Sequence, residues 1–521
     1  MINLLTKKSL INRTDYKYLV CESSYAIADN ERVFNTISDC ITYIGNDIPN
    51  RLGKIFVKKK ADESNWEDNI RLDTGGDWSG FEIEFEKDSK LVPKLSWGDS
   101  SDNDFGGAIF VSGLRTNNIQ FITNRIWSYS GGVFTKTSGS NLTSLTENYI
   151  HINKIEYKIS SMNATSITID TTYRTYTGRT DNIIIDATTK GYYYKNIKIK
   201  CDITSNEPYP SIGSLRYGLS VCCADVVFEG SIENLQADDA GAGNTASFIE
   251  LQFWNFDAGS NYYRDSGTAL QCCLSNVVMY GNINNCNATG NNCNGAVNCN
   301  YANLIINGNI ENCENQSPIE GNTIAGGLRT GYSNVKINNI INCRGFNGGA
   351  INSDRSYITV NNIENCQAWD INYGDGSGGG AYLVLNSILN FNKIKNCSAY
   401  GSGGALYMSD SIVEGNEIDN CKSQEGSNGG GICIFGYFSL KVKKLTNCYT
   451  NTQGGAISFQ STSKGYAKID YAQGNSTDGY DSDNYYNSAT AGKILLDLVK
   501  DDGSDTSAGN ALATGSRVVT I

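Results

Sequence analysis

The chain has 521 residues, with 42 Lys or Arg against 54 Asp or Glu, so its formal net charge is −12. An acidic chain without a basic block is poorly suited to nucleic acid or an anionic membrane as its main partner. Hydrophobic residues make up 40% of the chain, which is too many for a disordered polypeptide.

Residues 1–29 contain no apolar run long enough for the core of a signal peptide or for a membrane span. We therefore expect a chain that is made and folded in a cytoplasm. In that compartment its 17 Cys remain thiols rather than disulfides. The apolar residues that follow recur at helical spacing and predict a short amphipathic helix. These residues are Phe34, Ile37, Cys40, Ile41 and Ile44.

Between this helix and about residue 280, short apolar runs predict the strands of a repeating coil. Asp225–Leu235 matches Asn276–Cys286 at a shift of 51 residues. The segment 236–267 departs most from the pattern, and it is either a lid-sized loop or a loop that carries an additional strand. The predicted strands are Phe81–Phe85, Gly106–Phe110, Gly131–Phe134, Ile150–Ile155, Asn182–Ile185 and Ile197–Cys201.

From about residue 280 a unit of Ile or Leu, one variable residue, Asn and Cys recurs, and a Gly pair follows each copy. The segment from the Gly pair to the next Cys keeps a nearly constant length, whereas the segment from Cys to the Gly pair varies about twofold. A constant core with one variable loop is what stacked strands require. The copies end at Cys286, Cys313, Cys343, Cys366, Cys397, Cys421 and Cys448, and the residues after the Gly pairs are Leu328, Ala350, Ala381, Ala405, Ile432 and Ala456.

Strand alternation assigns a role to each position of the unit. The Ile points into the core, the variable residue faces water, and the Cys returns to the core as a small apolar side chain. The Asn sits where the strand turns, because Asn tolerates the left-handed conformation and its amide can bond from coil to coil. The period of 20–30 residues without a helical stripe predicts a β-solenoid.

This repeat resembles that of the right-handed parallel β-helices of the pectate-lyase type, which carry an asparagine ladder at one turn. The opening segment Val33–Val57 resembles that of phage tailspikes, in which a short helix caps the first coil. The resemblance implies an all-β, single-stranded right-handed parallel β-helix at 30–470. Residues 1–29 would be an N-terminal attachment segment, and residues 471–521 a C-terminal cap or oligomerisation segment.

The variable loops leave one edge of the stack, and two long ones at 314–325 and 367–378 flank a short one at 344–347. This arrangement predicts a groove, in which the two long loops are the walls and the short loop is the floor. Aromatic faces and carboxylates would suit an oligosaccharide there, although local packing is the alternative for the rings. The candidate glycan-binding residues are Glu314, Glu320, Arg344, Phe346, Trp369 and Tyr373, with Trp254, Tyr262 and Tyr263 from the segment 236–267.

Asp370 and Asp375 are the candidate catalytic pair for a glycan depolymerase, either a glycoside hydrolase or a lyase. Hydrolysis needs two carboxyls at a defined separation, and outward carboxylates one or two coils apart meet it automatically. The alternative is that both are ordinary polar loop residues, so whether the chain is an enzyme stays open. His151, the only histidine, is interpreted as structural.

We expect no cofactor and no metal site. Cys286, Cys293 and Cys299 do not have the spacing of a zinc motif. Asp478, Asp481 and Asp483 do not match a calcium-binding EF-hand loop, and a solvated linker is the simpler interpretation.

The tailspike resemblance implies a homotrimeric virion appendage that is assembled in the host cytoplasm and acts outside the cell. It would contact other virion proteins and recognise host surface polysaccharide, with or without cutting it. Two alternatives remain: a non-enzymatic structural virion protein, and a secreted bacterial adhesin or polysaccharide lyase. None of the three inserts into a membrane or binds nucleic acid.

Overall fold

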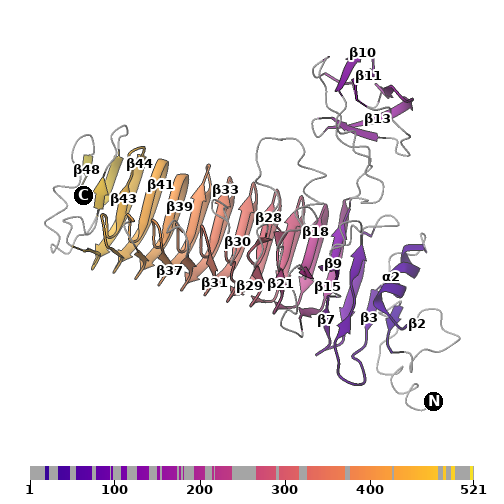
Figure 1. Ribbon diagram of the computed structural model, residues 1–521, viewed down its shortest axis with the longest axis horizontal. Coiled ribbons are helices and arrows are strands. Elements are labelled where there is room, and N and C mark those ends of the chain that lie inside the picture. Colours follow the sequence, from indigo (N-terminus) through magenta and orange to yellow (C-terminus); the bar gives the residue numbers. More distant parts are fainter. Residues whose placement is uncertain are drawn as a thin grey trace.

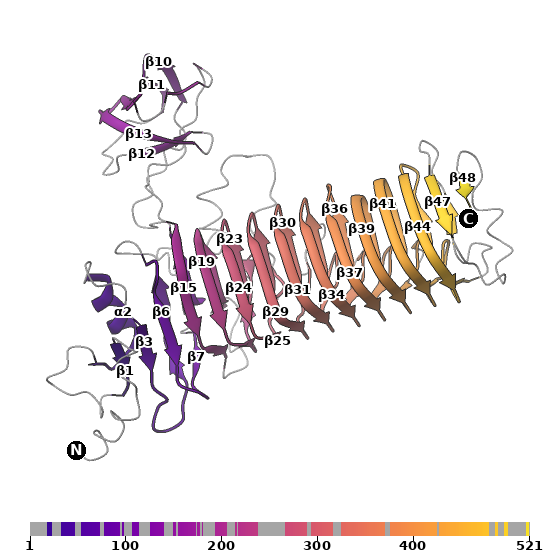
Figure 2. The same ribbon diagram turned by 180° about the vertical axis from the view of Figure 1, so that it is seen from behind.

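Most strands of the computed structural model run parallel to one another in a single long stack (Figure 1). Each strand pairs with the equivalent strand of the next coil, and the coils follow one another along the axis (Figure 2). The right-handed parallel β-helix expected from the sequence is confirmed. The structure describes residues 18–22, 33–46, 54–72, 78–93, 96–97, 107–113, 126–139, 149–152, 155–172, 175–177, 180, 193–205, 214–215, 217–237, 266–288, 293–315, 325–369, 376–424, 427–478, 485–487, 494–498 and 517–519.

Four files of strands build the stack. The first is β1 (Tyr18–Val20), β3 (Lys54–Val57), β6 (Glu82–Phe85), β15 (Tyr194–Lys200), β19 (Ala224–Glu229), β24 (Asn276–Tyr280), β29 (Asn303–Glu311), β31 (Asn334–Ile341), β34 (Tyr357–Glu364), β37 (Ile388–Lys395), β39 (Leu406–Asp419), β41 (Ile432–Thr446), β44 (Lys464–Gln473), β47 (Ile494–Leu498) and β48 (Arg517–Val519). The second is β5 (Ile70–Leu72), β9 (Gly107–Ser112), β18 (Tyr217–Cys222), β23 (Leu270–Cys273), β28 (Val297–Asn300), β30 (Leu328–Gly331), β33 (Ile351–Asp354) and β36 (Ala381–Val384), continued by β39, β41, β43 (Ile457–Phe459) and β46 (Tyr485–Asn487).

The third file is β4 (Trp66–Glu67), β7 (Lys90–Val92), β16 (Asp202–Thr204), β20 (Ile232–Glu233) and β25 (Ile283–Asn284), continued by the ends of the long first-file strands. The fourth contains β21 (Gln236–Ala237) and β26 (Asn287–Ala288), then β32 (Arg344–Gly345), β35 (Gln367–Ala368), β38 (Ser398–Ala399), β40 (Lys422–Ser423), β42 (Tyr449–Thr450) and β45 (Ser476–Thr477). The remaining two-residue strands are β2 (Val33–Phe34), β8 (Ser96–Trp97), β17 (Ser214–Leu215), β22 (Ser266–Gly267) and β27 (Cys293–Asn294).

The repeating Ile forms one continuous column in the core. Ile310 pairs with Ile340 and Ile340 with Ile363, and the register continues through Ile394 to Ile418. All of these side chains are fully buried. Because each residue pairs with its counterpart in the next coil, a length change inside a strand would break the register on both sides.

The repeating Asn occupies the corner between the third and fourth files, and its φ lies near +54° in copy after copy, as at Asn342 and Asn396. This confirms the left-handed conformation expected for it. The amides also bond along the stack: Asn342 Nδ2 donates to Asn312 Oδ1 over 3.0 Å, and Asn420 Nδ2 to Asn396 Oδ1 over 2.7 Å.

The repeating Cys is buried and unoxidised in every copy, which confirms its place in the core. Each thiol donates to the carbonyl oxygen two residues earlier, as Cys397 does to Lys395. Burial raises the pKa of Cys421, so this thiol stays protonated and unreactive.

The Gly pairs align differently from the sequence-based alignment at three copies. Leu328 pairs in register with Ile351, Ala381 with Leu406, and Ile432 with Ile457. The second residue of each pair lies one residue beyond the Ala that was expected at that position. The reason is that 378–380 and 429–431 are triple glycines and 325–327 is Ala-Gly-Gly, and the third residue of each set, a Gly, occupies the place of that Ala. The first Gly of each triple glycine is left-handed, with φ of +71° at Gly378 and +76° at Gly429.

The expected capping helix is present as α2 (Ile37–Asn46), and its apolar face is buried against the first coils. The carboxylate of Asp68 accepts hydrogen bonds from the backbone N–H of Ile37 and Ser38, which would otherwise have no partner at the helix start. Phe34 lies in β2, ahead of the helix. In the part of the chain that the structure describes, no helix is long and apolar enough to span a bilayer.

The strands expected at Gly131–Phe134 and Ile150–Ile155 belong to a separate antiparallel sheet, so their assignment to the coil was wrong. A two-residue turn at Gly131-Gly132 joins two of its strands, which is possible only between antiparallel neighbours. The sheet has its own core around Trp127 and projects from the stack in both ribbon views. Its strands are β10 (Ile126–Ser130), β11 (Val133–Ser138), β12 (Tyr149–Ile152), β13 (Ile155–Met162) and β14 (Ser166–Ile169).

His151 lies in β12, and the run at 182–185 lies outside the described residues. The ends of the stack also differ from the expected boundaries. The strand β1 pairs with β3 before residue 30, and β47 and β48 continue the parallel pairing beyond residue 470.

A tight contact between successive coils gives a first prediction. Phe391 points inward and fills the space above Gly415, where a Cβ atom would lie 2.1 Å from the ring. Gly415→Ala should lower stability by about 1–3 kcal/mol through overpacking, measured by calorimetry or denaturant unfolding. Adding Phe391→Leu should recover part of that loss, and a double variant no more stable than Gly415→Ala would contradict the packing described.

The asparagine corner gives a second prediction. Asn396→Gly should cost about 1–2 kcal/mol because it removes two amide hydrogen bonds, to Asn365 and from Asn420. Asn396→Ala should cost about 1 kcal/mol more, because Ala also has to adopt a left-handed conformation. Equal unfolding free energies for the two variants would show that the backbone conformation contributes nothing.

Candidate functional site

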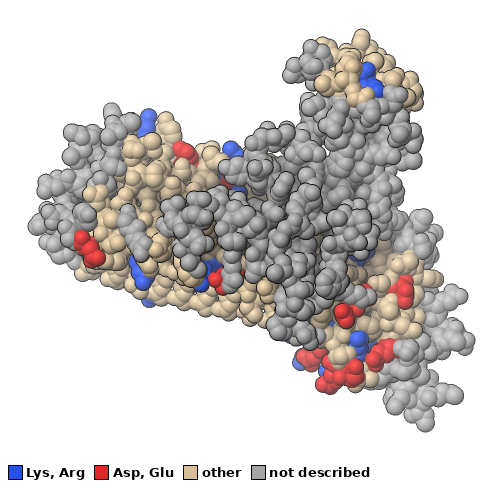
Figure 3. Space-filling view, viewed as in Figure 1, with Lys and Arg blue, Asp and Glu red and all other residues tan. Residues whose placement is uncertain are grey.

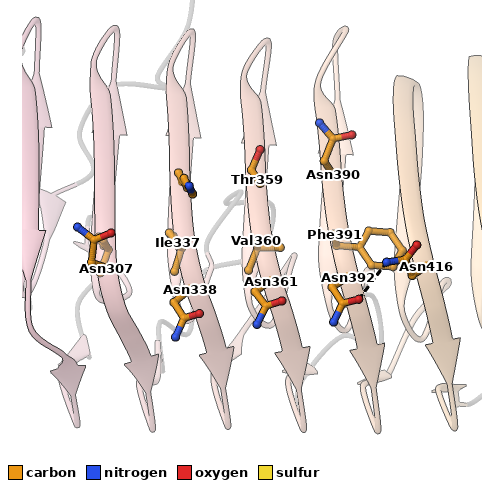
Figure 4. Close-up of a pocket in the computed structure, with 12 residues that line it drawn as sticks. Asn307, Ile337, Asn338, Thr359, Val360, Asn361, Asn390, Phe391, Asn392 and Asn416 are labelled. Atoms are coloured by element: carbon orange, nitrogen blue, oxygen red, sulfur yellow. Dashed lines mark hydrogen bonds between the residues drawn. The ribbon is translucent and has the colours of Figure 1, made fainter.

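A groove of about 430 Å³ crosses the outward face of the first file of strands, from β29 to β39 (Figure 4). We call it the asparagine groove. Asn338, Asn361 and Asn392 occupy the same outward position on successive strands, and Figure 4 shows their side chains in a row. The lining residues are Ile306, Asn307, Lys336, Ile337, Asn338, Thr359, Val360, Asn361, Asn390, Phe391, Asn392 and Asn416.

Strand alternation explains this surface. Ile337, Val360 and Phe391 point into the core, so the residues on either side of each point outward. Since the strands are in register, one residue type at one position becomes a row along the stack. Two outward positions per strand, such as 336 and 338, supply most of the polar groups of the groove.

The side-chain amides of the groove are held in place by hydrogen bonds to neighbouring amides, and these bonds leave some of their donors and acceptors unused. Asn338 donates to Asn309 and Asn416 donates to Asn392, each over 3.0 Å. A side-chain amide has two N–H donors and two acceptor lone pairs, and one bond of this kind uses only one of them. The exposed amides therefore present fixed donors and acceptors to solvent.

Aromatic side chains border the groove where the strands begin. Tyr357 is 45% exposed, and its hydroxyl accepts a hydrogen bond from Asn390 over 2.7 Å. At the adjacent corner Tyr301 and Tyr332 stack with ring centroids 4.5 Å apart, and the guanidinium of Arg355 lies over the Tyr332 ring. A polar floor beside aromatic rings is an arrangement that binds sugars, through hydroxyls on one side and C–H faces on the other.

None of the described residues that line the groove is an Asp or a Glu. Glycoside hydrolysis uses two carboxyls on either side of the scissile bond. The amides and hydroxyls of these lining residues can donate and accept the hydrogen bonds that bind a sugar.

The structure brings together part of the predicted glycan-binding set at another place, on the fourth file. Arg344 forms an ion pair with Glu314 over 3.2 Å and lies over the indole ring of Trp369. Phe346 and Trp369 follow the aligned residues Gly345 and Ala368, so they occupy equivalent positions of successive coils. Both rings are half-buried.

The remaining predicted site residues lie outside the described residues, and their roles stay predictions. They are Glu320, Tyr373, Trp254, Tyr262 and Tyr263, with the catalytic candidates Asp370 and Asp375.

The asparagine groove does not follow from a repeating unit that begins at the Ile. An Asn stands two residues earlier in four consecutive copies, and this spacing places it on the outward face. The copies are Asn338-Asn-Ile340, Asn361-Asn-Ile363, Asn392-Lys-Ile394 and Asn416-Glu-Ile418.

A row of buried polar residues lies on the second file, where Asn298 and Asn352 stand at aligned outward positions with Arg329 between them. Asp354 ends the same strand as Asn352. Burial raises the pKa of the Asp354 carboxyl, although the positive charges of Arg355 and Arg329 act in the opposite direction.

This carboxyl gives a third prediction. Asp354 holds its proton more tightly in the fold than in the unfolded chain, so its contribution to stability is present below the unfolded pKa of about 3.9 and is lost as pH rises through the higher folded pKa. Asp354→Asn should therefore lose less stability than the parent over that window, measured as Tm against pH. Asp470→Asn, at an exposed ion pair, is the control, and parallel profiles for Asp354→Asn and the parent would contradict the shift.

No family model matches the chain, and no curated protein matches it significantly. Among solved structures, it is similar to the Gp54 tailspike of Acinetobacter baumannii bacteriophage AP22, determined in complex with A. baumannii capsular saccharide. The match covers 93% of this chain and 76% of that chain, with 13% sequence identity and a TM-score of 0.31.

Proposed function

We propose that the chain binds a polysaccharide laid along the asparagine groove. The observation that carries this proposal is the row of exposed amides at one position of successive strands, Asn338, Asn361, Asn392 and Asn416. A polymer repeats its hydroxyl groups along its length, and the row repeats its donors and acceptors in the same way. The groove crosses four coil-to-coil steps, about 19 Å at roughly 4.8 Å per step, so it can hold several sugar units.

The fixed orientation of the side-chain amides supports a role in ligand recognition. Asn392 accepts from Asn416 and donates to Asn362, so its orientation is determined before any ligand arrives. Preorganised groups lose little conformational entropy when they bind. Tyr357 adds a ring beside the floor, held by its bond from Asn390.

The finer assignment follows the resemblance of the opening segment to phage tailspikes. On this proposal the chain is a virion appendage, assembled in the host cytoplasm, that attaches the particle to host surface polysaccharide. Residues 1–29 would join it to other virion proteins, and three copies would assemble. Since the described part of the groove lining carries no carboxylate, attachment without cleavage is favoured at this groove.

The fourth prediction tests the groove. The triple variant Asn338→Ala, Asn361→Ala, Asn392→Ala should bind purified host surface polysaccharide roughly 100-fold more weakly, since each lost hydrogen bond contributes about 1 kcal/mol. The measurement is calorimetric or surface-based titration. Asn276→Ala, an outward Asn on the same face but outside the groove, is the control.

Two outcomes would contradict parts of this proposal. Unchanged affinity in the triple variant, with its Tm preserved, would exclude the groove as the binding surface. Release of reducing ends by the parent protein would show cleavage, and loss of that release in Asp370→Asn or Asp375→Asn would locate it at those residues.

A further inference from the structure

The groove has a charge opposite to that of the chain as a whole. The chain carries 54 acidic and 42 basic residues, yet the lining, as far as the structure describes it, holds one Lys and no Asp or Glu. On the face shown in Figure 3, acidic side chains gather toward the N-terminal end of the stack. A surface that binds only neutral sugars has no need to exclude carboxylates, whereas one that binds an acidic polymer does.

Lys336 is the cation within the groove, and its side chain is exposed. Its register neighbours on the adjacent strands are Ile305 and Thr359, neither of which carries a charge. Among the described residues, no carboxylate forms an ion pair with it. The positive charge of Lys336 is therefore available to a ligand in the groove.

The rows of the groove continue into a second group of cations. The next strand after β39 is β41, and there Lys443 takes the position that Asn416 holds in the row of amides. Lys441 and Lys444 lie on either side of it, and all three are exposed. We call these three residues the lysine step.

The carboxylates that face the lysine step belong to the neighbouring strands β39 and β44. Glu417 is paired with Lys393 over 3.1 Å, and Asp470 lies 3.9 Å from Lys468. Glu414 is the register partner of Lys441. Within the described residues the lysine step forms no ion pair with these acidic groups. Together with Lys393 and Lys468, its lysines outnumber the three carboxylates, so a net positive charge remains.

From this arrangement we propose that the ligand of the asparagine groove is an acidic polysaccharide, with one sugar carboxylate held by Lys336 and a second by the lysine step. The inference rests on the proposed function, because it names the substrate class of the same groove. The strands β31 and β41 are four steps apart, about 19 Å, so both sites lie within reach of one bound polymer chain. Ammonium–carboxylate contacts are charge-assisted and strengthen at low ionic strength.

The test is an array of purified bacterial surface polysaccharides, acidic and neutral, in which each uronic-acid polymer is paired with its carboxyl-reduced form. The expected result is retention of acidic members and at least tenfold weaker binding of their reduced partners. Lys336→Gln should weaken binding of the acidic form about tenfold and reduce its salt dependence, and it should weaken binding of the reduced form much less. Replacing Lys441, Lys443 and Lys444 together with Gln should act in the same direction.

Lys198→Gln is the matched control, because Lys198 is an exposed lysine of the same face and strand position, several coils outside the groove. If the parent protein bound acidic and carboxyl-reduced polymers equally, and the triple Asn variant bound both more weakly, this inference would be overturned. The proposed function would still stand. Retention of no polymer would overturn both. Binding of single-stranded DNA as tight as that of the acidic polysaccharides would mean generic attraction of polyanions and would also overturn the inference.

Discussion

The parallel register between coils is the constraint on which the rest of this structure depends. Each residue pairs with its counterpart one coil away, so every position along the strand becomes a column along the axis. Inside the stack this produces the columns of Ile and Cys that form the core. At the corner it produces left-handed asparagines whose amides bond from coil to coil. On the outside the same rule turns an Asn of the repeat into a continuous row of amides, and thus turns a structural period into a surface.

How much of the fold could be predicted from the sequence depended on how far apart in the chain the interacting residues lie. The directions of Ile363 and Cys366 follow from alternation within a few residues, so they could be read from the repeat. The Gly-Gly at 131–132 could not be assigned that way, because the same dipeptide serves a hairpin turn in the small sheet and a bend in the coil. The triple glycines hid a one-residue shift that only strand pairing reveals.

The candidate site shows the same division between local and long-range information. Arg344 and Trp369 were expected near each other, and the guanidinium does lie over the indole ring, because both leave one edge of the stack at neighbouring coils. The asparagine groove was missed although its residues stand in the most regular part of the chain. Its chemistry arises from the sum of several outward positions on five strands, and a single copy of Asn-x-Ile carries no functional signal.

The small antiparallel sheet is an insertion between strands of the stack, and the stack forms without it. Strand β6 pairs directly with β15, and β9 with β18, so the coils on both sides of the insertion close on each other without any contribution from β10 to β14. Its core residues, among them Trp127 and Phe134, form a cluster of their own. The stack and the small antiparallel sheet can thus diverge separately in evolution. Recombination or mutation at their junction could exchange the sheet for another domain without altering the coils of the stack.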